Sequence, residues 1–385
     1  MTSRGQCVFW FEDGRRRSAH WRSESRPSPP SRVIVVRDTI TADTAYRYVC
    51  EGTALLWRGD FQNARQLLDA MARRVDRKSR KAMRTTGEQR SPADVFHRYR
   101  MDASRRARLL GMLLIELEPD CSIPLKRAPD AERAILEAFG RFGSSSVIPM
   151  REILGAIGAH EWRKKGVEIP FLEARVHPHY GVFSPIRREF VDLVAAAPLP
   201  SRDLAFDIGT GTGVLAAVLA KRGVERVVAT DVELRAVTCA RENIERLGFA
   251  GRVEVVQADL FPDDGEATKA PLIVCNPPWI PSKAVTSLER AVYDPKGGML
   301  HGFIKGLSAH LTSPGEAWLL LSDLAEHLGL RSRKDLLVAF ESADLKVEGK
   351  IDVRPEHPRV RDERDPLHVY RREETVSLWR LAHRP

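Results

Sequence analysis

Residues 204–280 constrain the fold of this 385-residue chain more than any other stretch. The run LAFDIG predicts a short buried strand, GTGTG a tight turn whose glycines let a ligand approach the backbone, and GVLAAVLAKRG a helix. Strand, glycine turn and helix in this order indicate a Rossmann-like βαβ unit. Asp231 ends the next apolar run, 24 residues after Asp207, where such a unit places a carboxylate for ribose hydroxyls.

The spacing of the glycines distinguishes between two classes of nucleotide-binding fold. Gly209, Gly211 and Gly213 give the pattern G-x-G-x-G. The fingerprint of dinucleotide-binding dehydrogenases, G-x-G-x-x-G, would need a small residue at the position of Val214. The spacing therefore argues against a nucleotide-dependent oxidoreductase.

A second motif, Asn276-Pro277-Pro278-Trp279, follows a further apolar run, LIVC, which predicts a fourth buried strand. The nitrogen of a carboxamide or of the adenine amine has a delocalised lone pair, so it attacks a methyl group poorly until acceptors hold both of its hydrogens. The Asn276 side-chain oxygen and the Pro277 carbonyl can be these two acceptors, and Trp279 offers a flat face for stacking. The alternative interpretation is a proline-rich turn that only ends a strand.

Length and composition predict two domains and a reducing, cytoplasmic location. An apolar fraction of 43% is sufficient for packed cores, and 385 residues exceed one ordinary domain of about 100–200 residues. No apolar run approaches the roughly 18 residues of a membrane span, and the N-terminus lacks the apolar stretch of a signal peptide. The five cysteines are scattered without a C-x-x-C pair, so we expect neither a disulfide framework nor a metal site.

The first part of the chain carries the whole positive excess. Residues 1–110 contain 24 lysines and arginines against 12 aspartates and glutamates, whereas the remainder contains 37 against 40. We predict a disordered leader over residues 1–32, or an over-extended reading frame, and a basic helical accessory domain over residues 33–165. The arginines from Arg73 to Arg108 then form either a solvated helix face or a footprint for RNA, DNA or a ribonucleoprotein.

Residues 166–183 alternate apolar and polar side chains, which predicts a β-hairpin at the start of a second domain over residues 166–385. His177 and His179 in this stretch have H-x-H spacing, but no third or fourth ligand lies nearby in the sequence. We therefore expect the two histidines to form hydrogen bonds or to contact substrate rather than to bind a metal.

Taken together, SPIRREF, DIGTGTGVLA, ATDVELRAV, QADLF and NPPWI resemble the HemK-type protein glutamine methyltransferases and the related small-domain RNA methyltransferases. The resemblance covers residues 166–385. It implies an α/β fold, a Rossmann-like class I methyltransferase with a seven-stranded, mostly parallel sheet, preceded by a small α-helical domain that selects the substrate. It also implies S-adenosyl-L-methionine (SAM) as the methyl donor.

The same resemblance assigns roles to individual positions. On the donor side it implies that the methionine end of SAM is held by Asp207, Gly209, Gly211 and Gly213, the ribose by Asp231, and the adenine by Asp259 and the Leu260 amide, with Asn276 bordering this pocket. On the acceptor side it implies that Asn276, Pro277 and Trp279 hold the target nitrogen.

Two departures from the family pattern lie on the acceptor side or at the lip of the donor pocket. The usual Asn-Pro-Pro-Tyr is Asn-Pro-Pro-Trp here, and the usual Pro-Arg-Pro-Glu-Thr-Glu is replaced by residues 184–189, SPIRRE. The methyl acceptor is therefore left open between a nucleic-acid base, in RNA or DNA, and a glutamine of a translation-related protein. The alternative function is a non-catalytic RNA- or ribosome-binding protein that retains a methyltransferase fold.

Overall fold

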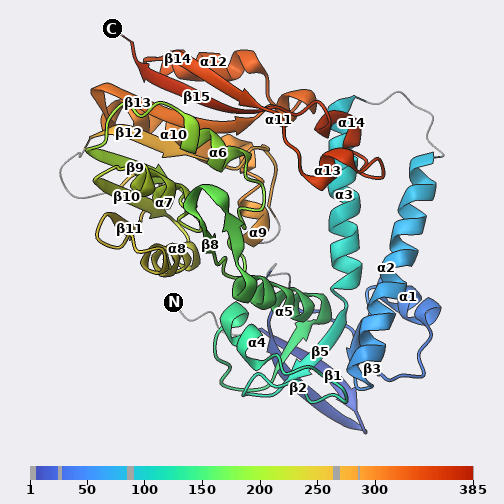
Figure 1. The fold of residues 1–385 in the computed structure, drawn as a ribbon. Coiled ribbons are helices and arrows are strands. Elements are labelled where there is room, and N and C mark those ends of the chain that lie inside the picture. The colour runs from blue at the N-terminus through green and yellow to red at the C-terminus, as the bar shows by residue number, and fades with distance from the viewer. Residues whose placement is uncertain (1–5, 25–27, 85–90, 263–268, 285–286, 385) are drawn as a thin grey trace. The chain divides into compact units, whose positions relative to one another are not determined.

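The computed structural model describes residues 6–24, 28–84, 91–262, 269–284 and 287–384, apart from the side chains of residues 79–84, 287–288 and 358. The chain divides into two compact units, drawn in Figure 1. The N-terminal unit comprises residues 1–90 and 97–161, and the C-terminal unit comprises residues 91–96 and 162–385. The division falls inside helix α5 (Met150–Lys165), a few residues before the predicted boundary at its end.

The C-terminal unit alternates strands and helices. Its elements from the hairpin onward are β7 (Val167–Ile169), η1 (Pro170–Leu172), β8 (Ala174–Val176), α6 (Glu189–Ala196), β9 (Leu204–Ile208), α7 (Val214–Lys221), β10 (Arg226–Asp231), α8 (Leu234–Arg246), β11 (Val253–Gln257), β12 (Ala270–Cys275), α9 (Ser287–Arg290), η2 (Pro295–Gly297), α10 (Gly298–His310), β13 (Leu311–Ser322), α11 (Leu324–His327), α12 (Arg333–Ser342), β14 (Leu345–Val353), α13 (Pro358–Arg361), α14 (His368–Arg371) and β15 (Val376–His383).

These strands form the predicted seven-stranded sheet, in the order β11-β10-β9-β12-β13-β15-β14 (Figure 1). The pairs from β11 to β13 are parallel, and β15 runs antiparallel to both of its neighbours. Apolar side chains of α6, α7 and α8 cover one face, and those of α10 and α12 cover the other. The central strands are therefore buried on both faces, which is why they read as continuous apolar runs. The predicted hairpin is confirmed as the antiparallel pair β7 and β8.

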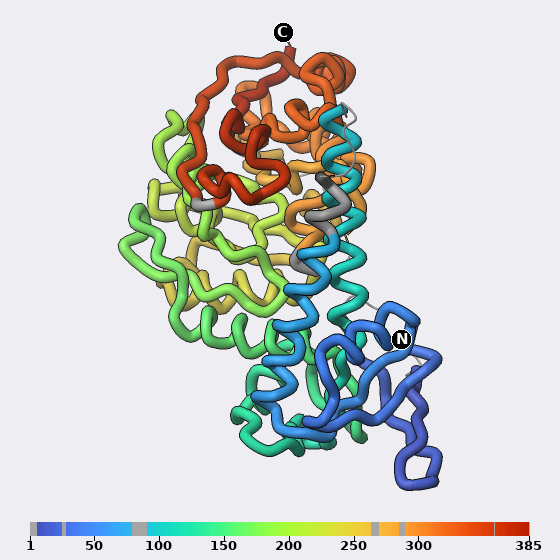
Figure 2. The backbone as a smooth tube through the Cα atoms, turned by 90° about the vertical axis from the view of Figure 1, so that its right-hand side faces the viewer, coloured from blue at the N-terminus to red at the C-terminus, as the bar shows by residue number. Residues whose placement is uncertain are grey.

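The N-terminal unit corrects two predictions. Its elements are β1 (Cys7–Glu12), β2 (Arg15–Trp21), β3 (Val33–Val36), α1 (Ala42–Cys50), β4 (Ala54–Trp57), α2 (Phe61–Arg84), most of α3 (Pro92–Leu110), β5 (Leu113–Leu117), α4 (Glu132–Phe139), β6 (Ser146–Pro149) and most of α5. The stretch predicted as a disordered leader over residues 1–32 contains the β1–β2 hairpin, drawn in dark blue in Figure 2. The domain predicted as α-helical over residues 33–165 contains four strands, which join the hairpin in a six-stranded sheet of order β1-β2-β6-β5-β4-β3.

The physical reason for the second correction is the length of the missed strands. β4 (ALLW) and β6 (SVIP) are four-residue runs that are buried throughout, and so short a run carries no period that distinguishes a strand from a helix. The predicted helical features are nevertheless present. The apolar stripe of α2 packs into the core through Phe61, Leu68 and Met71, and the Ser91 hydroxyl accepts the Asp94 amide at the start of α3. In the described part of the chain no helix is both long and apolar enough to cross a membrane.

Candidate active site

The predicted site residues meet at one edge of the seven-stranded sheet. Strands β9, β10 and β12 are parallel neighbours, and Ile208 pairs with Thr230 on one side and with Cys275 on the other. The GTGTG turn, Asp231 and Asn276 therefore follow three adjacent strand ends. In open α/β sheets, ligands bind at this carboxyl edge.

Asp207, the last polar residue of β9, holds the glycine turn in shape. Its Oδ2 accepts the Thr210 hydroxyl at 2.6 Å and the Ala216 amide at 3.0 Å, so one buried carboxylate oxygen joins the turn to the first residues of α7. Burial raises the pKa of Asp207 to about 6, although the two hydrogen bonds work in the opposite direction. The structure thus places Asp207 beneath the turn as its support.

The three glycines of the turn all have positive φ angles, of 73°, 56° and 81° in order, but their surroundings differ. A Cβ at Gly209 would lie 2.5 Å from the Met299 methyl, and one at Gly213 would lie 3.3 Å from the Ala240 Cα of α8. A Cβ at Gly211 would meet nothing within 4 Å. Gly213 is therefore required by helix packing, whereas Gly211 faces open space from which a ligand can approach the backbone.

Asp231 is tied to the same turn. Its Oδ2 accepts the Gly211 amide at 3.0 Å, and its Oδ1 accepts the Glu233 amide at 3.0 Å. Burial raises the pKa of this carboxyl, and these backbone hydrogen bonds oppose that shift. Each carboxylate oxygen has a second lone pair, so the side chain keeps the capacity to accept from a pair of hydroxyls.

The segment after β11 is held against α10. Leu260 has a φ of 68°, and its carbonyl accepts the Thr230 hydroxyl at 2.5 Å. The Phe261 ring stacks on His310, with centroids 4.1 Å apart and planes 9° apart, and it packs closely against Gly306. Asp259 is exposed beside this fixed pair. The loop is thus anchored at Leu260 and Phe261, directly after Asp259.

The Asn276-Pro-Pro-Trp279 motif folds back on itself. The indole Nε1–H of Trp279 donates to Asn276 Oδ1 at 3.0 Å, which fixes the direction in which the amide oxygen points. A carbonyl oxygen accepts two hydrogen bonds, so one lone pair remains for a ligand. One face of the indole is covered by the Arg187 guanidinium, 4.9 Å from a ring centroid. A planar ligand could therefore stack only on the opposite face.

Arg187 connects Trp279 to a buried cluster of charges. Its guanidinium lies 3.1 Å from Glu374 Oε1, which also accepts the Ser322 hydroxyl at 2.7 Å, and the Glu374 side chain is completely buried. In the described part of the chain, three atoms of this cluster are buried without a hydrogen-bond partner: Arg187 Nε, Glu189 Oε2 and Glu374 Oε2. Burial, followed by the charge of Arg187, lowers the pKa of His357 beside them. The covered side of Trp279 therefore borders a buried charge cluster in which three polar atoms lack a hydrogen-bond partner.

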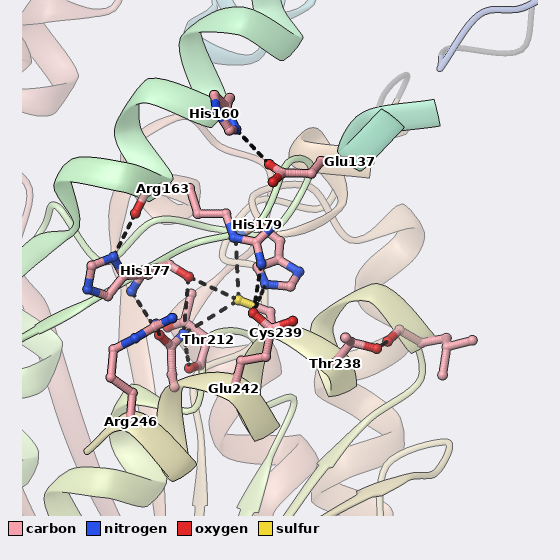
Figure 3. A network of polar contacts seen from close by, with 12 residues as sticks. Glu137, His160, Arg163, His177, His179, Thr212, Thr238, Cys239, Glu242 and Arg246 are labelled. Carbon is pink, nitrogen blue, oxygen red and sulfur yellow. Dashed lines mark hydrogen bonds and ion pairs between the residues drawn. The ribbon is translucent and has the colours of Figure 1, made fainter. Parts of the chain in front are cut away.

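Figure 3 shows that His177 and His179 are hydrogen-bonded, as expected. His177 Nδ1 lies 2.6 Å from the Arg163 carbonyl, and His179 Nε2 lies 2.9 Å from Glu242 Oε2. Burial raises the pKa of Glu242, but the His179 hydrogen bond and the charges of His179 and Arg163 outweigh it and lower the pKa overall. Among the described residues, no group of three or more His, Cys, Asp or Glu side chains could hold a metal ion. The His179 ring thus joins the segment after the hairpin to α8, and the His177 ring joins it to the end of α5.

The partners of two contributing residues cannot be read from the sequence. Asn243, in the last turn of α8, is buried, and its Nδ2 donates to the Thr212 carbonyl of the glycine turn at 3.1 Å. Glu374 reaches Arg187 across 187 positions of sequence. An asparagine on the apolar side of a helix can be noticed, but its partner can be identified only from the fold.

The arginines predicted to form a basic footprint have mixed surroundings. Arg73 and Arg77 are exposed on α2, whereas Arg74 pairs with Asp43 at 2.7 Å and Arg106 with Asp76 at 2.8 Å. The side chain of Arg80 lies outside the described residues, as do those of Lys81 and Arg84. The footprint remains a prediction.

Comparisons with known proteins show which proteins this chain resembles. The model of the family described as "Methyltransferase small domain" matches residues 173–342. The release factor glutamine methyltransferase of Moorella thermoacetica is 41% identical over 117 residues, which are 30% of this chain and 41% of that protein. The tRNA1(Val) (adenine(37)-N6)-methyltransferase of Bacteroides fragilis strain YCH46 is 31% identical over 158 residues, which are 38% of this chain and 67% of that protein.

A solved structure of a SAM-dependent methyltransferase from Thiobacillus denitrificans, in complex with S-adenosyl-L-homocysteine, covers 52% of this chain and 92% of its own chain, with 17% identity and a TM-score of 0.36. The chain spans less than half the length of the release factor methyltransferase that it matches. The family match over residues 173–342 includes the glycine turn and NPPW. On these matches, the chain belongs to the SAM-dependent methyltransferases of the methyltransferase small domain family.

Proposed function

We propose that this protein transfers a methyl group from SAM to a planar nitrogen, either of a nucleic-acid base or of a glutamine side chain in a protein of translation. The observation that carries the proposal is the Trp279–Asn276 hydrogen bond, which fixes an acceptor oxygen beside the glycine turn. When bound, SAM supplies an electrophilic methyl group. The protein has to hold this donor and to position the nitrogen.

The donor side fits SAM. The open space at Gly211 admits the ligand to the backbone, and Asp231, tied to the Gly211 amide, retains lone pairs for the ribose hydroxyls. Asp259 is exposed at the end of the anchored β11 loop and can accept from the adenine amine, with the Leu260 amide beside it. Asp207, Gly209 and Gly213 act on the donor indirectly in this scheme, because their contacts hold the turn and α7 in shape.

The acceptor side works by orientation. Asn276 Oδ1 and the Pro277 carbonyl accept the two hydrogens of the target nitrogen, which turns its lone pair toward the methyl group. Trp279 keeps the Asn276 oxygen in place, so its replacement of the family tyrosine adds a support that a phenol cannot give in this way. No general base is required, because the methylated nitrogen becomes acidic and can lose its proton afterwards.

Between the two acceptor classes, we favour a nucleic-acid base. The first 110 residues carry twice as many basic as acidic side chains, which suits a polyanionic partner. The named relatives include enzymes for both classes, a tRNA adenine methyltransferase and a release factor glutamine methyltransferase. The glutamine acceptor is therefore the second candidate.

The test is to incubate the protein with methyl-labelled SAM and either total RNA or ribosomal proteins and release factors. We expect label in RNA, at the exocyclic nitrogen of a base, and none with the Asp231→Ala variant. Label in glutamine would select the second candidate. Tight SAM binding without transfer to any of these acceptors would support the non-catalytic alternative.

A further inference from the structure

Two phenylalanines are exposed on the outer face of β1 and do not belong to a hydrophobic core. Phe9 is 49% exposed and Phe11 is 72% exposed. Their neighbours Val8 and Trp10 point to the other face, as the alternation of a strand requires, and are buried. A single exposed apolar side chain is ordinary, but two rings on successive outward positions of one strand form a platform.

Basic side chains surround this platform. In the β1–β2 register, Arg16 lies opposite Phe11, and its guanidinium stacks on the Phe9 ring at 4.5 Å from the centroid. Arg32 and Arg37 flank β3 and line the same groove as the two rings. All three arginines are exposed.

The groove has the size of a ligand site. It encloses about 850 Å³ between β1 and β3, the two edge strands of the six-stranded sheet, which lie close together but are not paired. Two acidic residues, Glu12 and Asp13, also line it. A hydrogen bond from Arg58 holds the pKa of Glu12 at about 2, and the ion pair at 2.8 Å neutralises its charge. With the charge of Glu12 neutralised, the three arginines outnumber Asp13, so the net charge of the lining side chains is positive.

We propose that this groove binds single-stranded nucleic acid, with bases stacked on Phe9 and Phe11 and phosphates contacted by Arg16, Arg32 and Arg37. Aromatic rings beside arginines provide the two contacts that such a strand needs, a stacking surface and a counter-charge. A duplex keeps its base faces covered, so it can use the arginines but not the rings. A peptide added to an edge strand would use the backbone and has no need of three arginines. The proposal is independent of methyl transfer.

The experiment is fluorescence anisotropy with the full chain and three labelled probes: oligouridine of about eight nucleotides, oligothymidine of the same length, and an RNA duplex. We expect both single strands to bind more tightly than the duplex. Preference for the oligouridine would identify RNA, and equal binding would identify single strands in general. With three phosphate contacts, the slope of log affinity against log salt should be about −2.

Variants separate stacking from charge. We expect Phe11→Ala to weaken binding of the single strands at least about fivefold and Phe9→Ala/Phe11→Ala at least about twentyfold, whereas Phe11→Tyr stays within about twofold of the parent. Arg16→Ala should flatten the salt slope by about 0.7, and the control Arg133→Ala, an exposed arginine of α4, should leave it unchanged. Unfolding temperatures should match throughout.

Three results would overturn the proposal. They are an oligouridine affinity that the double phenylalanine variant leaves intact, a duplex bound as tightly as the single strands, and no binding of either single strand at 50 mM salt. None of these results depends on an active methyltransferase site.

Discussion

The donor side and the acceptor side of the site satisfy their polar groups in different ways. On the donor side, the carboxylate oxygens of Asp207 and Asp231 accept hydrogen bonds from backbone amides and a hydroxyl of the protein itself. On the acceptor side, Arg187, Glu189 and Glu374 each keep a buried atom without a hydrogen-bond partner in the described part of the chain. Buried polar groups are normally satisfied. The difference teaches that the first side holds one fixed shape through satisfied carboxylates, whereas the second keeps buried polar atoms that the described side chains do not satisfy.

The largest effect is expected at Gly211, which would test the donor side. Gly211→Val should weaken SAM binding at least a thousandfold, about 4 kcal/mol, because a side chain at a φ of 56° is strained and also fills the space through which the ligand approaches. Calorimetry measures this directly. Gly251→Val, at a glycine that also has open space but no positive φ, is the control. Normal SAM affinity in Gly211→Val would contradict the claim that SAM approaches the backbone at Gly211.

The buried Asp207 should make the unfolding free energy of the protein depend on pH. Its pKa is about 6 in the folded protein, above the ordinary 3.8, so its contribution to stability is fully present below about pH 4 and is lost as the pH rises through 6. The loss amounts to about 3 kcal/mol. We expect the difference in unfolding free energy between Asp207→Asn and the parent to shift in favour of the variant by about this amount from pH 4 to pH 7. A difference in unfolding free energy that stays the same from pH 4 to pH 7 would contradict the account.

Arg187 tests the acceptor side. Arg187→Ala leaves the Glu374 carboxylate buried without its cation and uncovers Trp279, so we expect the unfolding free energy to fall by about 2 kcal/mol and the KM of the acceptor to rise. SAM affinity should stay the same, since the donor residues keep their contacts. Arg188→Ala, the exposed neighbour, is the matched control. A loss of SAM affinity in Arg187→Ala alone would show that the two sides are not separate.

The smallest effect is expected from one indole hydrogen bond. Trp279→Phe keeps a ring but removes the donor to Asn276, which should reduce kcat about fivefold, equivalent to about 1 kcal/mol, without changing SAM affinity. Trp318→Phe removes a similar indole bond, to Glu316, and should not change kcat. Equal kcat values for Trp279→Phe and Trp318→Phe would contradict the orienting role of Trp279.

The sequence could predict most of the C-terminal unit because its signals are local. Apolar strands, a glycine turn and a motif after a strand end each fit in one window, and they specify the sheet and the residues at its edge. The N-terminal unit was predicted poorly because its strands are short and because the first hairpin, rich in arginine and exposed phenylalanine, lacks a clear apolar alternation. Its hydrophobic core becomes visible only when the strands are assembled.

Within the site, what the sequence could not predict is what depends on distant partners. The Arg187–Glu374 pair and the Asn243–Thr212 bond join segments that only the fold brings together. Nor could the spacing distinguish the three glycines, which differ in whether Met299, open space or Ala240 lies opposite them. Local pattern predicted the positions, and tertiary contacts separate Asp207 and Gly213, which hold the turn, from Gly211, which faces open space.

The central claim, that one side of the site holds the donor while the other orients the nitrogen, is tested most directly at Asn276. SAM affinity by calorimetry and the single-turnover rate of methyl transfer to the acceptor fraction labelled by the parent should be measured together for Asn276→Ala and Asn276→Asp. We expect Asn276→Ala to bind SAM within about twofold of the parent and to transfer at least about a hundredfold more slowly. Asn276→Asp, which keeps an acceptor oxygen, should recover part of the rate. A normal rate in Asn276→Ala, or a slow rate explained entirely by lost SAM binding, would contradict the claim.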